Sequence, residues 1–193
     1  MKLLRFLPHC FIAVLLLRSG PSLGQAAEKQ NPQVLEYITR YQELAMEEMR
    51  RSGIPASITL AQGIHESGAG NSRLAVEGNN HFGIKCKKEW TGPSLRHSDD
   101  RPHECFRKYA SVAESYRDHS DFLRTRPHYA FLFQLDPLDF KGWAYGLKRA
   151  GYATAPNYPE SLLRLIELYE LHQYDLVVRK DIDPSVGTTN KHP

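Results

Sequence analysis

Apolar residues recur every three or four positions in several stretches of this chain, which is the spacing of an amphipathic helix. The first stretch predicts a helix over residues 31–51, which "SGIP" ends. Pro55 suits the first turn of a second helix, which runs to about Glu66. Gly68 and Gly70 follow and end it.

Helical patterns return in the second half of the chain. The capping box "SVAE", residues 111–114, opens a helix that reaches about Arg124. "DPLDFKGWAYGLKRAG" predicts another helix, with Asp136 as N-cap, Pro137 at the first position and Gly151 as the stop. "NYPESLLRLIELYELHQY" predicts one continuous last helix.

Two regions lack the helical period. Residues 78–109 are rich in Gly, Pro, His and charged residues, and short apolar clusters flank their polar centre. This pattern favours a small hairpin or an ordered loop. Residues 176–193 are polar and are expected to form a flexible tail. We therefore expect one mainly helical domain over residues 31–175, with one irregular insertion.

The N-terminus has the features of a secretory signal peptide. "MKLLRFLPHCFIAVLLLRSGPSLGQAA" has two basic residues, then a short apolar run, then small residues. Because that run is too short to span a bilayer, it favours export over a permanent membrane anchor. We expect residues 1–24 to be removed, with cleavage after Gly24, Ala26 or Ala27. The mature protein would then reside in the periplasm, outside the cell or in the cell wall.

Removal of this segment changes the charge. Of 25 basic residues, three (Lys2, Arg5 and Arg18) lie in it, which leaves 22 basic against 22 acidic residues. A basic surface for nucleic acid is therefore not expected. Cys86 and Cys105 remain as an even pair, which permits a disulfide in an exported protein, although two free buried thiols are equally compatible. No zinc-binding spacing is present, and we expect no cofactor and a monomer.

Four features could carry chemistry. Glu66 ends an apolar helix, where burial would raise its pKa toward that of a general acid, although a solvated glutamate at a helix end fits the spacing too. An acidic cluster in the irregular region could supply the second carboxylate of a glycoside hydrolase or be a solvated loop. The tyrosines of "GYATAPNY" could stack on a sugar or pack the core, and the amides of "NNHFGIK" could bind acetamido groups or cap loops. The acidic cluster consists of Asp99, Asp100 and Glu104.

These features occur in an order that resembles a known family. "ESGAGNS", "NNHFGIK", "EWTGP", "CFRKYASVAESYRDHSDFL" and "AGYATAPNYPESLLRLIE" are similar, in that order, to the glucosaminidase domain of glycoside hydrolase family 73. The resemblance covers about residues 33–175. It implies a lysozyme-like helical fold with a small β-hairpin lobe over a substrate groove. It also implies hydrolysis of the β-1,4 bond between N-acetylglucosamine and N-acetylmuramic acid in peptidoglycan glycan strands.

The resemblance also assigns roles to residues. Glu66 aligns with the family's catalytic acid, and Tyr152 matches its important tyrosine. The second carboxylate falls between "WTGP" and "FRKY", where we favour Asp100 and then Asp99. We expect four residues to contact the substrate: Asn80, Phe82, Tyr109 and Tyr158.

Two departures from the family pattern stand out. Ala69 replaces a common aromatic residue, so the groove could lose a stacking platform, and Ala155 replaces a turn-stabilising Asp. Two alternative functions remain open at this point: a lytic transglycosylase, which also relies on one glutamate, and a non-catalytic wall-binding module.

Overall fold

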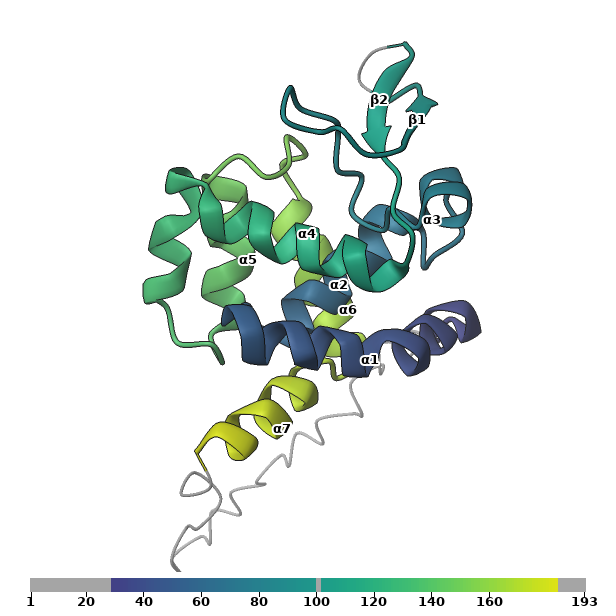
Figure 1. Cartoon of the computed structure of the whole chain (residues 1–193). Coiled ribbons are helices and arrows are strands. Elements are labelled where there is room, and N and C mark those ends of the chain that lie inside the picture. Colours follow the sequence, from purple (N-terminus) through teal and green to yellow (C-terminus); the bar gives the residue numbers. More distant parts are fainter. Residues whose placement is uncertain (1–28, 100–101, 184–193) are drawn as a thin grey trace, which may run out of the picture.

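A computed structural model describes residues 29–99 and 102–183 of the chain (Figure 1). The expected signal peptide, Asp100 and residues 184–193 lie outside this part. The described part is mainly helical with one two-stranded antiparallel hairpin, which confirms the expected fold class. In chain order its elements are α1 (Pro32–Ser52), α2 (Ala56–Ser67), α3 (Arg73–Gly78), β1 (Ser94–His97), β2 (Glu104–Arg107), α4 (Val112–Thr125), the 3-10 helix η1 (Pro127–Gln134), α5 (Phe140–Arg149), α6 (Tyr158–Leu168) and α7 (His172–Ile182).

The central element is α2, which packs against α1, α5, α6 and α7. Every residue from 56 to 64 is buried, including the polar Ser57, Thr59 and Gln62, so α2 lies inside the core on all sides. Pro55 provides no side-chain cap for its N-terminus. Instead Asp175 of α7 accepts hydrogen bonds there from the backbone N–H (2.8 Å) and the hydroxyl (2.5 Å) of Ser57. A distant segment therefore caps the core helix.

The hairpin projects from one end of the helical body, and α7 lies at the opposite end (Figure 1). Strands β1 and β2 pair with Leu95 opposite Phe106 and Arg96 opposite Cys105. A disulfide joins Cys105 to Cys86, so the segment before β1 is linked covalently to β2. Of the two alternatives for this cysteine pair, the structure has the bonded one.

Two helix boundaries differ from the sequence prediction. The helix expected to start at Pro137 starts at Phe140, because Asp139 is the residue whose carboxylate accepts from the N–H of Gly142 (2.8 Å). Asp136 instead accepts from the N–H of Leu138 in a separate turn. Pro137 therefore belongs to that turn.

The single last helix and the start of the tail were predicted wrongly. The pattern divides into α6 and α7 because Glu170 adopts a left-handed backbone (φ 51°) and Leu171 turns into the core, where it is fully buried. Helix α7 then continues to Ile182, so residues 176–182 are helical rather than a flexible tail. The short helices α3 and η1 were not predicted. None of the helices described is both long enough and apolar enough to span a membrane.

Candidate active site

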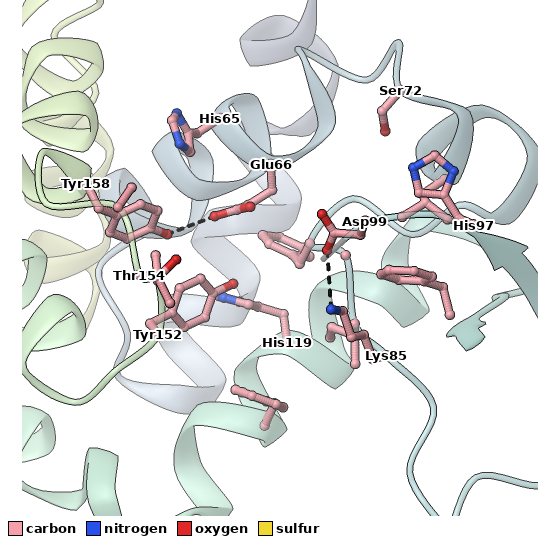
Figure 2. Close-up of a pocket in the computed structure, with 18 of the residues that line it drawn as sticks. His65, Glu66, Ser72, Lys85, His97, Asp99, His119, Tyr152, Thr154 and Tyr158 are labelled. Carbon is pink, nitrogen blue, oxygen red and sulfur yellow. Dashed lines mark hydrogen bonds and ion pairs between the residues drawn. The ribbon is translucent and has the colours of Figure 1, made fainter. Parts of the chain in front are cut away.

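A cleft of about 570 Å³ lies where the C-terminus of α2, the hairpin, α4 and the loop before α6 meet. Figure 2 shows its side chains converging from these separate segments. The residues that line it include His65, Glu66, Phe82, Lys85, His97, Asp99, His119, Phe122, Arg126, Tyr152, Thr154, Ala155 and Tyr158.

Glu66 occupies the last turn of α2, two residues before the left-handed residue Gly68, whose N–H bonds the carbonyl of Ile64. The carboxyl is only partly exposed, and its burial raises its pKa. A second, weaker influence in the same direction is the negative charge of Asp99. The C-terminal end of a helix also disfavours an anion, so the position as a whole favours a protonated carboxyl.

A chain of three hydrogen-bonding side chains holds Glu66. The Gln62 amide donates to the Tyr158 hydroxyl (3.0 Å), which in turn donates to Oε1 of Glu66 (3.0 Å; Figure 2). This second bond favours the ionised carboxylate and so opposes part of the effect of burial on the pKa. Gln62 was not among the residues predicted from the sequence. Its signal was a polar residue one helical turn before Glu66, between the apolar residues Ala61 and Ile64.

Tyr152 lies against Tyr158 at the bottom of the cleft. The two rings stack with centroids 5.8 Å apart and planes inclined by 28°. Burial raises the pKa of Tyr152 well above its ordinary value, so its hydroxyl keeps its proton at neutral pH. Both tyrosines of "GYATAPNY" therefore line the same cleft as Glu66.

The described members of the acidic cluster lie in different places. Asp99 lines the cleft, and its Oδ2 lies 3.3 Å from the ammonium of Lys85 (Figure 2). Glu104 on β2 does not line the cleft, and both its carboxylate oxygens bond the same ammonium, at 3.0 and 3.1 Å. Asp100 falls outside the described residues. Of the described members, Asp99 is the one that shares a cleft with Glu66.

Of the four residues expected to contact substrate, two line the cleft and two lie outside it. Phe82 and Tyr158 line the cleft. Asn80 is buried outside it, and its amide bonds the backbone of Ile84 and Arg107. The Tyr109 hydroxyl donates to Asp118, also outside the cleft. Asn80 and Tyr109 thus hold the hairpin region in place without reaching the groove.

The two residues that depart from the family pattern, Ala69 and Ala155, lie in different places. Ala69 has a left-handed backbone (φ 53°) and borders a different hollow of about 120 Å³ beside Tyr37 and Tyr41. Ala69 itself does not line the cleft around Glu66. Ala155 does line that cleft.

His65, expected to be a surface or packing residue, is exposed at the cleft rim, with its ring edge-on to Tyr158 (5.5 Å). Within residues 29–99 and 102–183, no three His, Cys, Asp or Glu side chains are grouped so that they could bind a metal ion. The polar side chains that line the described cleft carry carboxyls, hydroxyls, imidazoles, ammonium groups and a guanidinium.

Comparisons with known proteins identify the family of this chain. Residues 42–171 match the glucosaminidase family, described as mannosyl-glycoprotein endo-beta-N-acetylglucosaminidase. Among relatives, the exo-glucosaminidase LytG of Bacillus subtilis is 33% identical over 145 residues, covering 69% of this chain and 49% of LytG. The peptidoglycan hydrolase FlgJ of Vibrio cholerae is 31% identical, covering 67% of this chain and 42% of FlgJ. The chain thus spans less than half the length of either relative.

Solved structures share the fold. The catalytic domain of the autolysin Auto from Listeria monocytogenes has a TM-score of 0.66 at 27% identity, covering 77% of this chain and 91% of that domain. The glycoside hydrolase domain of FlgJ from Salmonella typhimurium has a TM-score of 0.60 at 26% identity, covering 79% of this chain and 97% of that domain. Since the family match extends over more than half of the sequence, this chain belongs to the glucosaminidase family, glycoside hydrolase family 73.

Proposed function

We propose that this protein hydrolyses the β-1,4 bond between N-acetylglucosamine and N-acetylmuramic acid in peptidoglycan, with Glu66 as the general acid. The observation that carries the proposal is the environment of Glu66: a half-buried carboxyl with a raised pKa, in a cleft, with one oxygen bonded to Tyr158. Because Tyr158 donates to Oε1, the proton of the acid would reside on Oε2 and pass to the glycosidic oxygen. Relatives described as a glucosaminidase and as peptidoglycan hydrolases support the substrate.

Asp99 is our candidate for the second carboxylate. It would stabilise the positive charge that develops on the sugar, or activate the attacking water. Asp99 lines the same cleft as Glu66, and its Oδ2 lies 3.3 Å from the Lys85 ammonium. Asp99→Asn is expected to lower kcat roughly 100-fold or more. Asp121→Asn, on the exposed side of α4, is the control. Wild-type turnover by Asp99→Asn would transfer the role to Asp100.

The aromatic residues would bind the sugar. The rings of Phe82, Phe122 and Tyr152 provide apolar surface in the cleft, and the neutral Tyr152 hydroxyl would contact the sugar at the reaction centre. A pyranose presents both apolar faces and hydroxyls, so this mixture suits it. The volume of the cleft is in the range of sites for small ligands.

Glu66→Gln tests the general acid directly. The variant keeps the size and the acceptor for Tyr158 but carries no acidic proton, so release of fragments from purified cell wall should fall by roughly 100-fold or more. Glu77→Gln is the matched control, because Glu77 is an exposed glutamate in α3 that pairs with Arg73. Full activity of Glu66→Gln would refute the proposal.

Product analysis distinguishes the alternative functions. A glucosaminidase leaves N-acetylglucosamine at the reducing end, whereas a lytic transglycosylase leaves 1,6-anhydromuramic ends. Mass spectrometry of the released fragments separates these products. A wall-binding module would sediment with the wall and release nothing.

We also propose that the protein is exported after removal of residues 1–24, with the cleavage site at Gly24, Ala26 or Ala27. The disulfide between Cys86 and Cys105 supports an oxidising compartment. N-terminal sequencing of the secreted or periplasmic protein should therefore start at Gln25, Ala27 or Glu28. Recovery of a chain that starts at Met1 from the membrane fraction would contradict this.

A further inference from the structure

His119 of α4 has an unusual position at the base of the cleft. It lines the cleft but is fully buried, and its ring stacks on Phe82 with centroids 4.0 Å apart and planes inclined by 15°. On another side it meets Tyr152 edge-on, at 6.0 Å between centroids. His119 thus connects the apolar wall of the cleft with the tyrosine beside Glu66.

Both ring nitrogens of His119 are buried and have no hydrogen-bond partner within the described part of the chain. Burial lowers the pKa of the ring to about 3, so the imidazole is neutral, with one N–H donor and one acceptor nitrogen. Leaving both without a partner costs stability. A phenylalanine would stack on Phe82 equally well without that cost, so packing alone does not account for an imidazole here.

Tyr152 offers the complementary group. Its hydroxyl forms no hydrogen bond with residues 29–99 or 102–183, and its ring meets the His119 ring edge-on, so the two side chains lie next to each other in Figure 2. The two rings are already in edge contact, and a hydrogen bond between them would require one ring to change its orientation. Burial keeps the proton on Tyr152, which makes that hydroxyl the donor and the neutral imidazole the acceptor.

We propose that His119 is a positioning residue, which accepts a hydrogen bond from the Tyr152 hydroxyl when substrate fills the cleft. With its proton directed at His119, the Tyr152 oxygen presents its lone pairs to the sugar, where positive charge develops. His119 itself touches no substrate in this arrangement. The inference rests on the proposed function, because it requires Tyr152 to act at the reaction centre.

His119→Phe tests the proposal, because it keeps the stack on Phe82 and removes both nitrogens. We expect Tm to stay within about 2 °C of wild type or to rise. On a soluble peptidoglycan fragment, kcat should fall about tenfold and KM should change by less than about twofold. Ser120→Ala is the control: Ser120 is also buried on α4 with no hydroxyl partner in the described part, but it lies outside the cleft. Its kcat should match wild type.

A double-mutant cycle with Tyr152→Phe separates positioning from packing. If His119 acts through Tyr152, then His119→Phe has no further effect on kcat in the Tyr152→Phe background. Full additivity of the two losses would overturn the proposal, as would wild-type kcat in His119→Phe. If His119→Phe does not fold, His119→Gln and His119→Leu replace it. Only Gln carries an acceptor, so its kcat must exceed that of Leu several-fold.

The result also separates this inference from the proposed function. If Glu66→Gln and Tyr152→Phe are impaired while His119→Phe turns over normally, only the role of His119 is wrong. If Glu66→Gln is fully active, the proposed function itself fails, whatever His119→Phe does.

Discussion

Glu66 experiences opposing influences from its neighbours, and their balance sets how the carboxyl titrates. Burial has the largest effect and raises its pKa, while the hydrogen bond from Tyr158 lowers it. The net direction is upward, so more of the acid form persists as pH rises. If Glu66 is the general acid, as proposed, it must be protonated to work, and the alkaline limb of kcat/KM against pH reports its pKa in the free enzyme.

Tyr158→Phe should raise the pKa of Glu66 further, because it removes the hydrogen bond that favours the carboxylate. The alkaline limb of kcat/KM against pH is therefore expected to move to higher pH, even if the maximum rate falls. Tyr145→Phe is the control, since Tyr145 is an exposed tyrosine whose hydroxyl bonds Glu160. A limb that moves to lower pH would show that Tyr158 does not stabilise the ionised form.

The cap of α2 links two elements far apart in sequence. Asp175 on α7 satisfies the N-terminal donors of the helix that carries Glu66 at its other end. Burial raises the pKa of Asp175 from 3.8 to about 7. The folded protein therefore holds this proton more tightly than the unfolded chain does, and the resulting stability is lost as pH rises from about 4 through 7.

Asp175→Asn isolates this effect, because the amide resembles the protonated carboxyl at every pH. Relative to the variant, the wild type should lose on the order of 2–4 kcal/mol of unfolding free energy between pH 4 and pH 8. Denaturant unfolding at a series of pH values measures the difference, in which contributions common to both proteins cancel. The prediction would be contradicted if the unfolding free energy of the wild type increased relative to that of the variant as pH rises.

The contact between α1 and α2 depends on a glycine. A Cβ at Gly63 would lie 2.4 Å from the hydroxyl of Tyr37. That hydroxyl also bonds His81 (2.9 Å) and Tyr116 (2.8 Å), so it has little freedom to move. The close approach of the two helices therefore requires the absence of a side chain.

Gly63→Ala should destabilise the protein by about 1–3 kcal/mol, although alanine is the better helix former. Gly53→Ala is the comparison, because no atom lies within 4 Å of its Cβ position. There only the left-handed backbone (φ 81°) opposes alanine, at a cost of about 1 kcal/mol. Urea unfolding of both variants checks the order, and a larger loss for Gly53→Ala would disprove the steric argument.

At the scale of the whole molecule, a disulfide links strand β2 of the hairpin to the segment before β1. The bond from Cys86 to Cys105 closes a loop that contains both β1 and Asp99, so it constrains one wall of the cleft. The other wall belongs to α2 and the loop before α6. Stability and activity should therefore both respond to the bond.

Replacing both cysteines with serine should lower the free energy of unfolding by roughly 3 kcal/mol in the chain-entropy model, and should also lower kcat/KM. Thermal unfolding and turnover with and without a reductant provide the measurement. The wild type should respond to the reductant and the double variant should not. Equal stability of the oxidised wild type and the double variant would mean that the loop is held without the bond.

Local patterns in the sequence were sufficient to predict several helix boundaries. The cap at Ser111 and the end of α2 at Gly68 follow from hydrogen bonds and backbone angles within a few residues, so neighbouring residues alone specify them. Glu66 was a candidate for the same reason: an acid at the end of an apolar helix is visible in the sequence. The ordered motifs then indicated the family.

Only the tertiary structure decided which side chains meet. The break at Glu170 allows α7 to pack on α2, and this brings Asp175 to Ser57. Tyr158 reaches Gln62 and Glu66 because α6 packs on α2. Contacts between residues separated by about a hundred positions depend on how helices pack, and a periodicity of three or four residues carries no information about that. The sequence by itself therefore determined several of the helices and the acid at the end of α2, and the packing of the helices decided the cleft.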